Sequence, residues 1–325
     1  MPTMQNAHID RALTNISVAY LQDASAFIAD KVFPIVPVKR QSDVFYTYNK
    51  GDFMRDEAKV RGAGTESAGG DYGVEASDPY YCRKHAFHKD VTPEERANYD
   101  EPLNADTDAT DFVSQKMLIR REMEWSSKFF TPGVWGTEVS GVDASPAGNQ
   151  TIKWDSPTSN PIKDITGAAV KMASETGFKP NVLVLSPYAY TALTNHEDIL
   201  DRIKYTQKGI VTADLLATLF GVDKVVVAWG VVNSAVKGAA DAVDFIMGKH
   251  ALLCYVAPRP ALRKPSAGYI FAWTGLEGSG AYGNRIVRLP MDILGLGTER
   301  IEGEIAFDVK KVCADLGYFF KDIVS

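Results

Sequence analysis

The sequence has 325 residues, 45% hydrophobic and 23% charged, which is typical of soluble globular proteins long enough for two or three domains. The formal net charge of −6 gives no support for general nucleic-acid affinity through phosphate neutralisation. Cys82, Cys254 and Cys313 are odd in number and far apart, which argues against a disulfide framework, and the sequence predicts no signal peptide, membrane span or internal repeat.

Residues 1–40 predict a short helix over 9–21, followed by an extended apolar arm. Pro34 and Pro37 keep this arm extended, and no regular partner lies nearby in the sequence. Its apolar residues are Val32, Phe33, Ile35, Val36 and Val38. An apolar extended arm must lie on another surface, either of its own domain or of a neighbouring chain.

Residues 43–90 predict one long hairpin. Its tip, residues 61–73, is rich in glycine and small polar residues, and the returning segment alternates without a clean apolar face. An isolated two-stranded ribbon is only marginally stable in water, so we expect this ribbon to lie on another surface, with adjacent subunits as the obvious candidates.

We therefore expect contacts between subunits to come from the arm and the hairpin. The candidate residues are Phe33, Ile35, Val36, Lys39, Arg40, Arg61, Tyr81, Arg83 and Phe87. The basic residues Lys39, Arg40 and Arg61 flank the hairpin and suit acidic surfaces across an interface. Ordinary surface charge is the alternative for these three.

A short helix is predicted after Thr92, because Thr92, Pro93 and Glu95 form a capping sequence. Residues 106–130 then predict one uninterrupted helix of roughly 36 Å, since it contains neither proline nor glycine. Its predicted buried side consists of Phe112, Val113, Met117, Ile119, Met123 and Phe130. Its charged residues, predicted to be solvated or paired, are Lys116, Arg120, Arg121, Glu122 and Glu124.

A compact α/β region is predicted from residue 160. Helices are expected after Asn160, Ser186 and Thr212, with another short one near residues 199–203, and Gly177 and Gly221 end two of them. Strands are predicted over 182–185, 224–229, 243–247, 251–256, 269–273 and 285–289. Residues 299–325 predict one long strand that ends in an aromatic cluster and returns to the domain of the long helix.

Candidate chemistry is sparse. The glycine pattern at 278–283 precedes a predicted strand instead of the helix that a dinucleotide site needs, so we interpret it as a flexible loop. Cys82, His85 and His88 are suitable zinc ligands, but we favour ordinary surface histidines on the ribbon. No catalytic motif stands out, so the sequence predicts a protein that is not an enzyme, with no catalytic residues, cofactor or metal.

The order of arm, hairpin, lone long helix, α/β region and terminal strand resembles the major capsid proteins of tailed bacteriophages. The resemblance covers nearly the whole chain and rests on architecture, not on a short motif. It implies the HK-97-type fold, of the α+β class. The implied parts are an N-terminal arm (1–40), an E-loop hairpin (41–90), a P-domain with its spine helix 106–130 (91–162 plus 296–325) and an A-domain (163–295).

The resemblance also implies a function. The chain would form hexamers and pentamers of identical subunits in an icosahedral virion head, assembled in the host cytoplasm, which encloses double-stranded DNA without binding it specifically. It implies a separate scaffolding protein and a portal protein, and no membrane. Lys50 and Lys59 lie in the hairpin, but no partner asparagine can be assigned, so crosslinking between subunits is not expected.

Two alternatives remain open at this point. One is the shell protein of an encapsulin-like nanocompartment, which shares the fold by family resemblance. The other is an α/β enzyme that uses residues 160–295, which would require a pocket with converging titratable groups.

Overall fold

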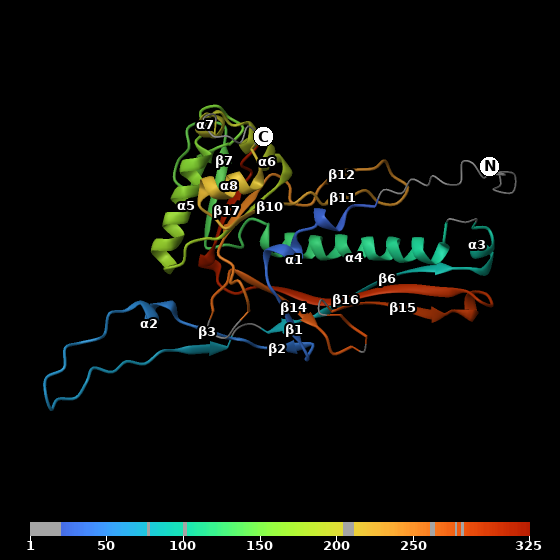
Figure 1. Cartoon of the computed structure of the whole chain (residues 1–325), viewed down its shortest axis with the longest axis horizontal. Helices are drawn as coiled ribbons and strands as arrows, with labels where there is room; N and C mark the ends of the chain where they lie inside the picture. Colours follow the sequence, from blue (N-terminus) through green and yellow to red (C-terminus); the bar gives the residue numbers. More distant parts are fainter. Residues whose placement is uncertain are drawn as a thin grey trace.

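The computed structural model describes residues 21–76, 79–99, 103–203, 211–260, 264–276, 278–280 and 283–325. Figure 1 shows a rounded α/β lobe, an elongated lobe built along a long helix, and a loop that projects away from both. The helix predicted over 9–21 lies outside the described residues except for its last position.

One long strand, β16, organises the elongated lobe (Figure 1). It pairs antiparallel with β6 along one edge, and with β15 and then β14 along the other, while β1 pairs parallel with β14. These strands are β1 (Ile35–Val38), β6 (Arg83–Val91), β14 (Gly268–Trp273), β15 (Asn284–Pro290) and β16 (Glu299–Lys311). Because β16 is shared by all these pairings except β1–β14, the lobe depends on it.

The long helix α4 (Ala105–Phe129) lies across one face of this sheet. The side chain of Asn104 accepts hydrogen bonds from the amides of Asp106 and Thr107, which satisfies two donors at the helix start. Gly303 of β16 permits the close approach, since a Cβ there would lie 2.5 Å from the Val113 side chain. The predicted long helix is thereby confirmed within one residue at each end.

The buried side of α4 differs from the prediction. Val113 and Phe130 are buried as predicted, but Phe112 and Met123 are 41% and 39% exposed. Trp125, Phe129 and Glu122, which was predicted to be solvated or paired, are fully buried. The first half of the helix packs on the sheet, but its second half packs between the arm and the α/β lobe. The buried side therefore follows two different neighbours, which a single helical stripe cannot describe.

The α/β lobe contains a six-stranded sheet in the order β10-β9-β13-β17-β7-β8. Its strands are β7 (Thr137–Val142), β8 (Gln150–Ile152), β9 (Val182–Leu185), β10 (Lys224–Val227), β13 (Ala251–Cys254) and β17 (Gly317–Lys321). The helices of this lobe are α5 (Pro161–Thr176), α6 (Pro187–Asn195), α7 (Glu197–Ile203) and α8 (Ala213–Phe220). All four helices of the predicted α/β region are confirmed.

The predicted terminal strand is wrong in its second half. A short turn, η4 (Ala314–Leu316), separates β16 from β17, and β17 pairs with β13 and β7 of the α/β lobe. Conversely, β14 and β15, which the predicted 163–295 domain includes, pair with β16 in the elongated lobe. Strand pairing thus groups these segments differently from the predicted domain boundaries, and the four-part division remains a prediction.

The predicted hairpin is shorter than expected. Its paired segments are β2 with β5 and β3 with β4, and the returning chain leaves the hairpin at Arg83 to pair with β16 as β6. These strands are β2 (Ser42–Asp43), β3 (Tyr46–Tyr48), β4 (Val74–Ala76) and β5 (Tyr80–Tyr81). About half of the predicted returning segment therefore pairs with its own chain as β6.

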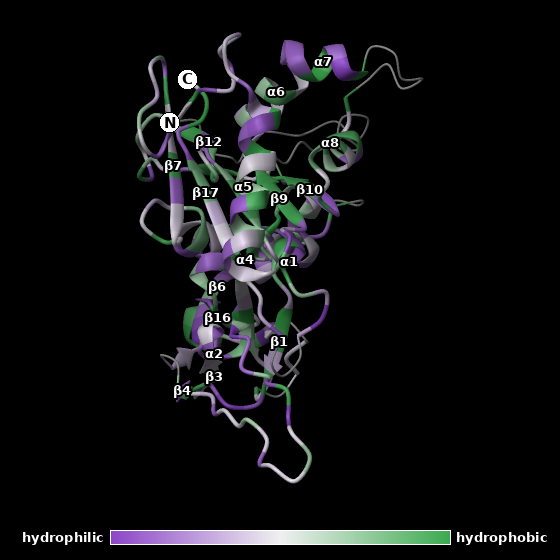
Figure 2. Cartoon of the chain, turned by 90° about the vertical axis from the view of Figure 1, so that its left-hand side faces the viewer, coloured by the Kyte–Doolittle hydropathy of each residue, from purple (hydrophilic) through white to green (hydrophobic). Residues whose placement is uncertain are grey.

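Short elements complete the described chain. They are η2 (Ala24–Ala26), α1 (Ala29–Val32), α2 (Lys50–Met54), α3 (Pro93–Ala97), the hairpin β11 (Val231–Asn233) and β12 (Val243–Phe245), and η3 (Asp292–Leu294). In Figure 2 the buried strand β9 is coloured hydrophobic, whereas the projecting loop carries mixed colours. Among the described residues, none of the helices combines the length and apolarity needed to cross a bilayer.

Candidate assembly surfaces

The loop of residues 44–76 projects from the body of the chain (Figures 1 and 2). At its base, the three-residue pairing of β3 with β4 holds the two sides together, and Asn49 caps α2 by accepting from the Gly51 amide. Tyr48, Phe53 and Tyr72 form a small aromatic cluster, with ring centroids 5.3–6.0 Å apart. An ion pair between Lys50 and Asp315 also links α2 to the body.

This loop exposes large apolar side chains without a covering element. The exposed ones are Val44, Tyr46, Phe53, Met54, Val60, Tyr72 and Val74, with Val60 fully exposed. A contiguous exposed apolar surface on a soluble protein usually marks an interaction site, because leaving it in water is unfavourable. The loop is therefore the strongest candidate assembly surface of the described chain.

The arm has the opposite character. Phe27, Ile28, Val32 and Phe33 are nearly completely buried, and β1 continues the arm as an edge strand of the five-stranded sheet. The ring of Phe33 lies 4.6 Å from that of Phe129, centroid to centroid. The arm was expected to lie either on its own domain or on a neighbouring chain, and its described segment lies on its own chain.

A buried carboxylate fixes the arm to α4. Glu122 Oε2 accepts hydrogen bonds from the amides of Ile28 and Ala29 at 3.0 and 2.9 Å, which are the first amides of α1. Burial raises the pKa of Glu122 to about 7, although the two amides and Arg121 act in the opposite direction. The sequence analysis missed this residue, but its spacing of three and seven residues before Trp125 and Phe129 places it on their side of the helix.

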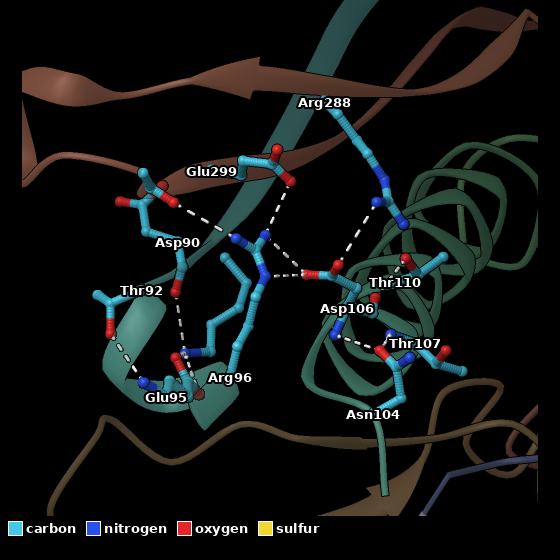
Figure 3. Close-up of polar contacts among 12 residues, drawn as sticks. Asp90, Thr92, Glu95, Arg96, Asn104, Asp106, Thr107, Thr110, Arg288 and Glu299 are labelled. Atoms are coloured by element: carbon cyan, nitrogen blue, oxygen red, sulfur yellow. Dashed lines mark hydrogen bonds and ion pairs between the residues drawn. The ribbon is translucent and has the colours of Figure 1, made fainter. Parts of the chain in front are cut away.

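A polar network closes the far end of the elongated lobe (Figure 3). The guanidinium of Arg96 in α3 donates to Asp106 at 2.9 Å and to Glu299 at 2.7 Å, and Arg288 lies 3.5 Å from the other oxygen of Asp106. Hydrogen bonding to Asp106 raises the pKa of Arg96 further. The network joins α3, α4, β15 and β16, so it stabilises this end of the lobe.

The sheet face also carries charge pairs. Arg300 and Asp90 form two hydrogen bonds of 2.7 and 3.0 Å across β16 and β6, which lower the pKa of Asp90. Glu304 contacts both Lys84 and Arg285, and these contacts outweigh burial and lower the pKa of Glu304. Paired charges across strands fix their register.

The predicted contact residues occupy different environments. Phe33 is buried in its own chain and offers no surface to a neighbour in this conformation, while Ile35 and Val36 are half-buried in β1. The remaining predicted residues are exposed: Lys39, Arg40, Arg61, Tyr81, Arg83 and Phe87. Of these, only Arg61 lies in the projecting loop, so the structure does not bring the set together. Whether any of them contacts another subunit stays a prediction.

The candidate metal residues do not converge. Cys82 is buried with its thiol 3.4 Å from the Phe271 carbonyl oxygen, and burial raises its pKa to about 12. His85 packs against Phe307 instead. Within the described residues, no group of three potential ligands is placed to hold a metal ion.

The strand predicted to follow the 278–283 glycine pattern is confirmed as β15.

An open hollow of about 490 Å³ in the α/β lobe is the place to look for an active site. It is lined in part by Trp154, Tyr188 and His196. His196 Nε2 lies 3.0 Å from Ser159 Oγ, and its Nδ1 accepts from the Asp198 amide at 3.2 Å, which makes Nε2 the protonated nitrogen. Both nitrogens are thus engaged in holding the local structure, and the hollow gains no free base from this residue.

Comparison with known proteins identifies what the chain is similar to. Residues 141–244 match the family model of phage major capsid protein E. The chain is 27% identical to the major capsid protein of Pseudomonas phage JBD67, over 98% of this chain and 97% of that protein.

Solved structures resemble the whole chain. A phage-related protein from Bordetella bronchiseptica superposes with a TM-score of 0.69 at 24% identity, covering 97% of both chains. The capsid of cyanophage P-SCSP1u gives a TM-score of 0.62 at 10% identity, covering 97% of this chain and 93% of that one. The predicted fold class is confirmed: this is the α+β HK-97-type fold found in phage capsids and in encapsulins.

Proposed function

We infer that this chain is a major capsid protein of a tailed bacteriophage, a structural protein of the virion head. The resemblance predicted from the sequence is confirmed by the capsid relatives. The observation that links this inference to a mechanism of assembly is the projecting loop of residues 44–76, which exposes seven large apolar side chains.

Physical chemistry explains why such a loop suits a shell. Each exposed apolar side chain that becomes buried against a neighbour contributes about 1.5–3 kcal/mol before losses of side-chain and loop freedom. One loop contact of this kind is modest, but each subunit both gives a loop and receives one. Contacts that close a ring or lattice raise the effective concentration of every other contact, so the sum becomes stable.

We extend this to specific partners. Identical subunits would form hexamers and pentamers, with a separate scaffolding protein guiding assembly and a portal protein at one vertex. The enclosed double-stranded DNA would not be bound specifically, and the net charge of −6 supports this, because an acidic subunit does not hold phosphates tightly. The lack of a recognised catalytic constellation supports a purely structural role.

An encapsulin-like compartment is the alternative, because encapsulins share this fold. The capsid relatives at the level of sequence favour the phage. Electron microscopy of particles from their native source separates the two: DNA and a tail vertex support the virion head, whereas packaged enzyme supports the compartment.

Expression of the full chain provides the direct test. Negative-stain microscopy and analytical ultracentrifugation are expected to show assemblies of many identical copies, such as rings and shells, whose diameter varies because the scaffolding protein is absent. A compact monomer in which residues 44–76 resist protease under assembly conditions would contradict the proposal, since the loop would then be covered without a neighbour.

A further inference from the structure

The junction between α1 and α4 contains a fully buried carboxylate for which shell assembly gives no reason. One oxygen of Glu122 accepts the first two amides of α1, whereas the other, Oε1, has no hydrogen-bond partner. The Nε atom of Arg121 and the indole nitrogen of Trp125 are likewise buried without partners. Unpaired buried polar atoms are unfavourable, and a buried charge is more so. The docking of α1 on α4 should therefore be sensitive to the charge of Glu122.

The charges around Glu122 do not neutralise it. Arg121 directly precedes Glu122 on α4, but it forms its ion pair with Asp30 of α1 at 3.1 Å. Arg121 and Asp30 therefore act on Glu122 in opposite directions. Among the described residues, Arg121 and Asp30 are the charged groups that act on Glu122, and the buried cluster shared by α1, α4 and the α/β lobe is hydrophobic.

We propose that Glu122 is a protonation-controlled clasp that holds α1 on the long helix when neutral and weakens that hold when ionised. The proton belongs on Oε1, since the lone pairs of Oε2 are engaged by the Ile28 and Ala29 amides. The neutral carboxyl keeps both hydrogen bonds while removing a charge from an apolar site. Protonation thus strengthens the docking of α1 because it removes the unfavourable free energy of burying a charge, and the two hydrogen bonds remain.

Release would be local. On one side Gln22 exchanges two hydrogen bonds of 2.9 Å with the backbone of Val231, and on the other β1 pairs with β14. The segment under control therefore spans residues 23–33, which include the buried Phe27 and Phe33. Weakening of the clasp exposes these apolar side chains without detaching the rest of the arm.

The direction of the pH dependence follows from the raised pKa. A group whose pKa rises from 4.5 when free to about 7 when docked favours docking fully below pH 4.5. The preference is lost as the pH rises through 7 and is constant above it. The ratio of docked to released α1 should fall by roughly one to two orders of magnitude between pH 5 and pH 8.

Hydrogen–deuterium exchange on the full-length chain tests this between pH 5 and pH 8, with rates corrected for the intrinsic pH dependence of amide exchange. Protection of residues 26–33 is expected to fall by the stated factor in the wild type and to stay constant in Glu122→Gln. Glu124→Gln is the matched control, because Glu124 lies two residues away and pairs with Arg120 instead. This control should reproduce the wild-type profile.

A second variant keeps the test decisive if Glu122→Gln does not fold. Asp30→Asn removes a negative charge beside Glu122 and frees Arg121 to pair with it, so the fall in protection should become smaller and end at a lower pH. Unchanged protection in the wild type, or an unchanged profile in Asp30→Asn or Glu122→Gln, overturns the proposal. Because the readout is a local property of one chain, it does not depend on whether shells form.

Discussion

The arm and the loop are neighbouring segments that both contain large apolar side chains, but those of the arm are buried and many of those of the loop are exposed. Residues 27–33 of the arm bury four large apolar side chains in the chain's own core, whereas residues 44–76 of the loop leave seven exposed. The difference lies in what each segment meets. The arm fits between α4 and the α/β lobe, whereas the loop is joined to the body near its ends, by one ion pair and by the stacking of Phe45 on Phe271.

This contrast narrows the part of the chain that depends on other subunits. The sequence predicted contacts with other subunits from both the arm and the hairpin. Much of these two segments instead packs within a single chain. Among the described residues, the loop exposes the most large apolar side chains of any one segment, although Ile293, Leu294 and Leu296 are also exposed near the end of β15. Contacts between subunits should therefore be sensitive to the loop, and the stability of the single chain to the arm.

Removing the loop gives the largest expected effect. Tyr48 and Val74 are paired across β3 and β4, so a short turn after Tyr48 can replace residues 49–73 without disturbing the body. Shells should disappear from micrographs and from the sedimentation profile, while the thermal midpoint of the monomer stays close to that of the full chain. Shells that form normally without these residues would show that the loop is dispensable and break the contrast.

Two phenylalanines test the same contrast by stability. Phe33→Ala in the arm should lower the free energy of unfolding by about 3–5 kcal/mol, because a fully buried ring leaves a cavity. Phe53→Ala in the loop should change it by less than about 1 kcal/mol, since that ring is 59% exposed. Urea denaturation of both variants measures the difference. Equal losses would mean that the loop packs on its own body in solution.

Substitutions of charged residues test the same comparison through smaller changes in the free energy of unfolding. Arg96→Ala in the elongated lobe removes contacts to Asp106 and Glu299 and should cost about 1–2 kcal/mol of unfolding free energy. Arg61→Ala in the loop removes one exposed contact to the Thr65 carbonyl and should cost less than about 0.5 kcal/mol. A cost for Arg61→Ala as large as that for Arg96→Ala would contradict the division into a stable body and a dependent loop.

Acid stability gives the smallest expected effect. The pKa of Asp90 is lowered chiefly by its hydrogen bonds to Arg300, so its stabilising contribution is present above its ordinary pKa of 3.8 and is lost as the pH falls through the lowered value. Asp90→Asn should therefore flatten the pH dependence of unfolding below pH 4, measured by chemical denaturation. Glu66→Gln in the loop is the control and should leave that dependence unchanged.

Local signals made much of the fold predictable. Capping residues such as Thr92 and Asn160, and the stop at Gly177, placed helices within a residue or two because those signals act over a single turn. Features that depend on contacts between distant parts of the sequence could not be predicted from such local signals. The register of β6 on β16, the split of the tail into β16 and β17, and the burial of Glu122 depend on partners far away in the sequence.

The candidate assembly surface was predictable only in part. Glycine and polar residues at 61–73 indicated a projecting tip, and the structure places that tip in the projecting loop. Phe33 was chosen for its apolar character, but hydrophobicity alone cannot distinguish a side chain destined for its own core from one destined for a neighbour. Tyr46 and Phe53, which the structure exposes, were missed for the same reason.

The placement of β16 and β17 has a consequence for how the chain matures on the ribosome. Every strand that pairs with either of them is translated earlier, with Asp90 preceding its partner Arg300 by 210 positions. A nascent polypeptide consequently lacks an interior strand of the elongated lobe's sheet until synthesis has passed residue 311, and one of the α/β lobe's sheet until it has passed residue 321. Neither sheet can therefore close before almost the whole chain has been synthesised.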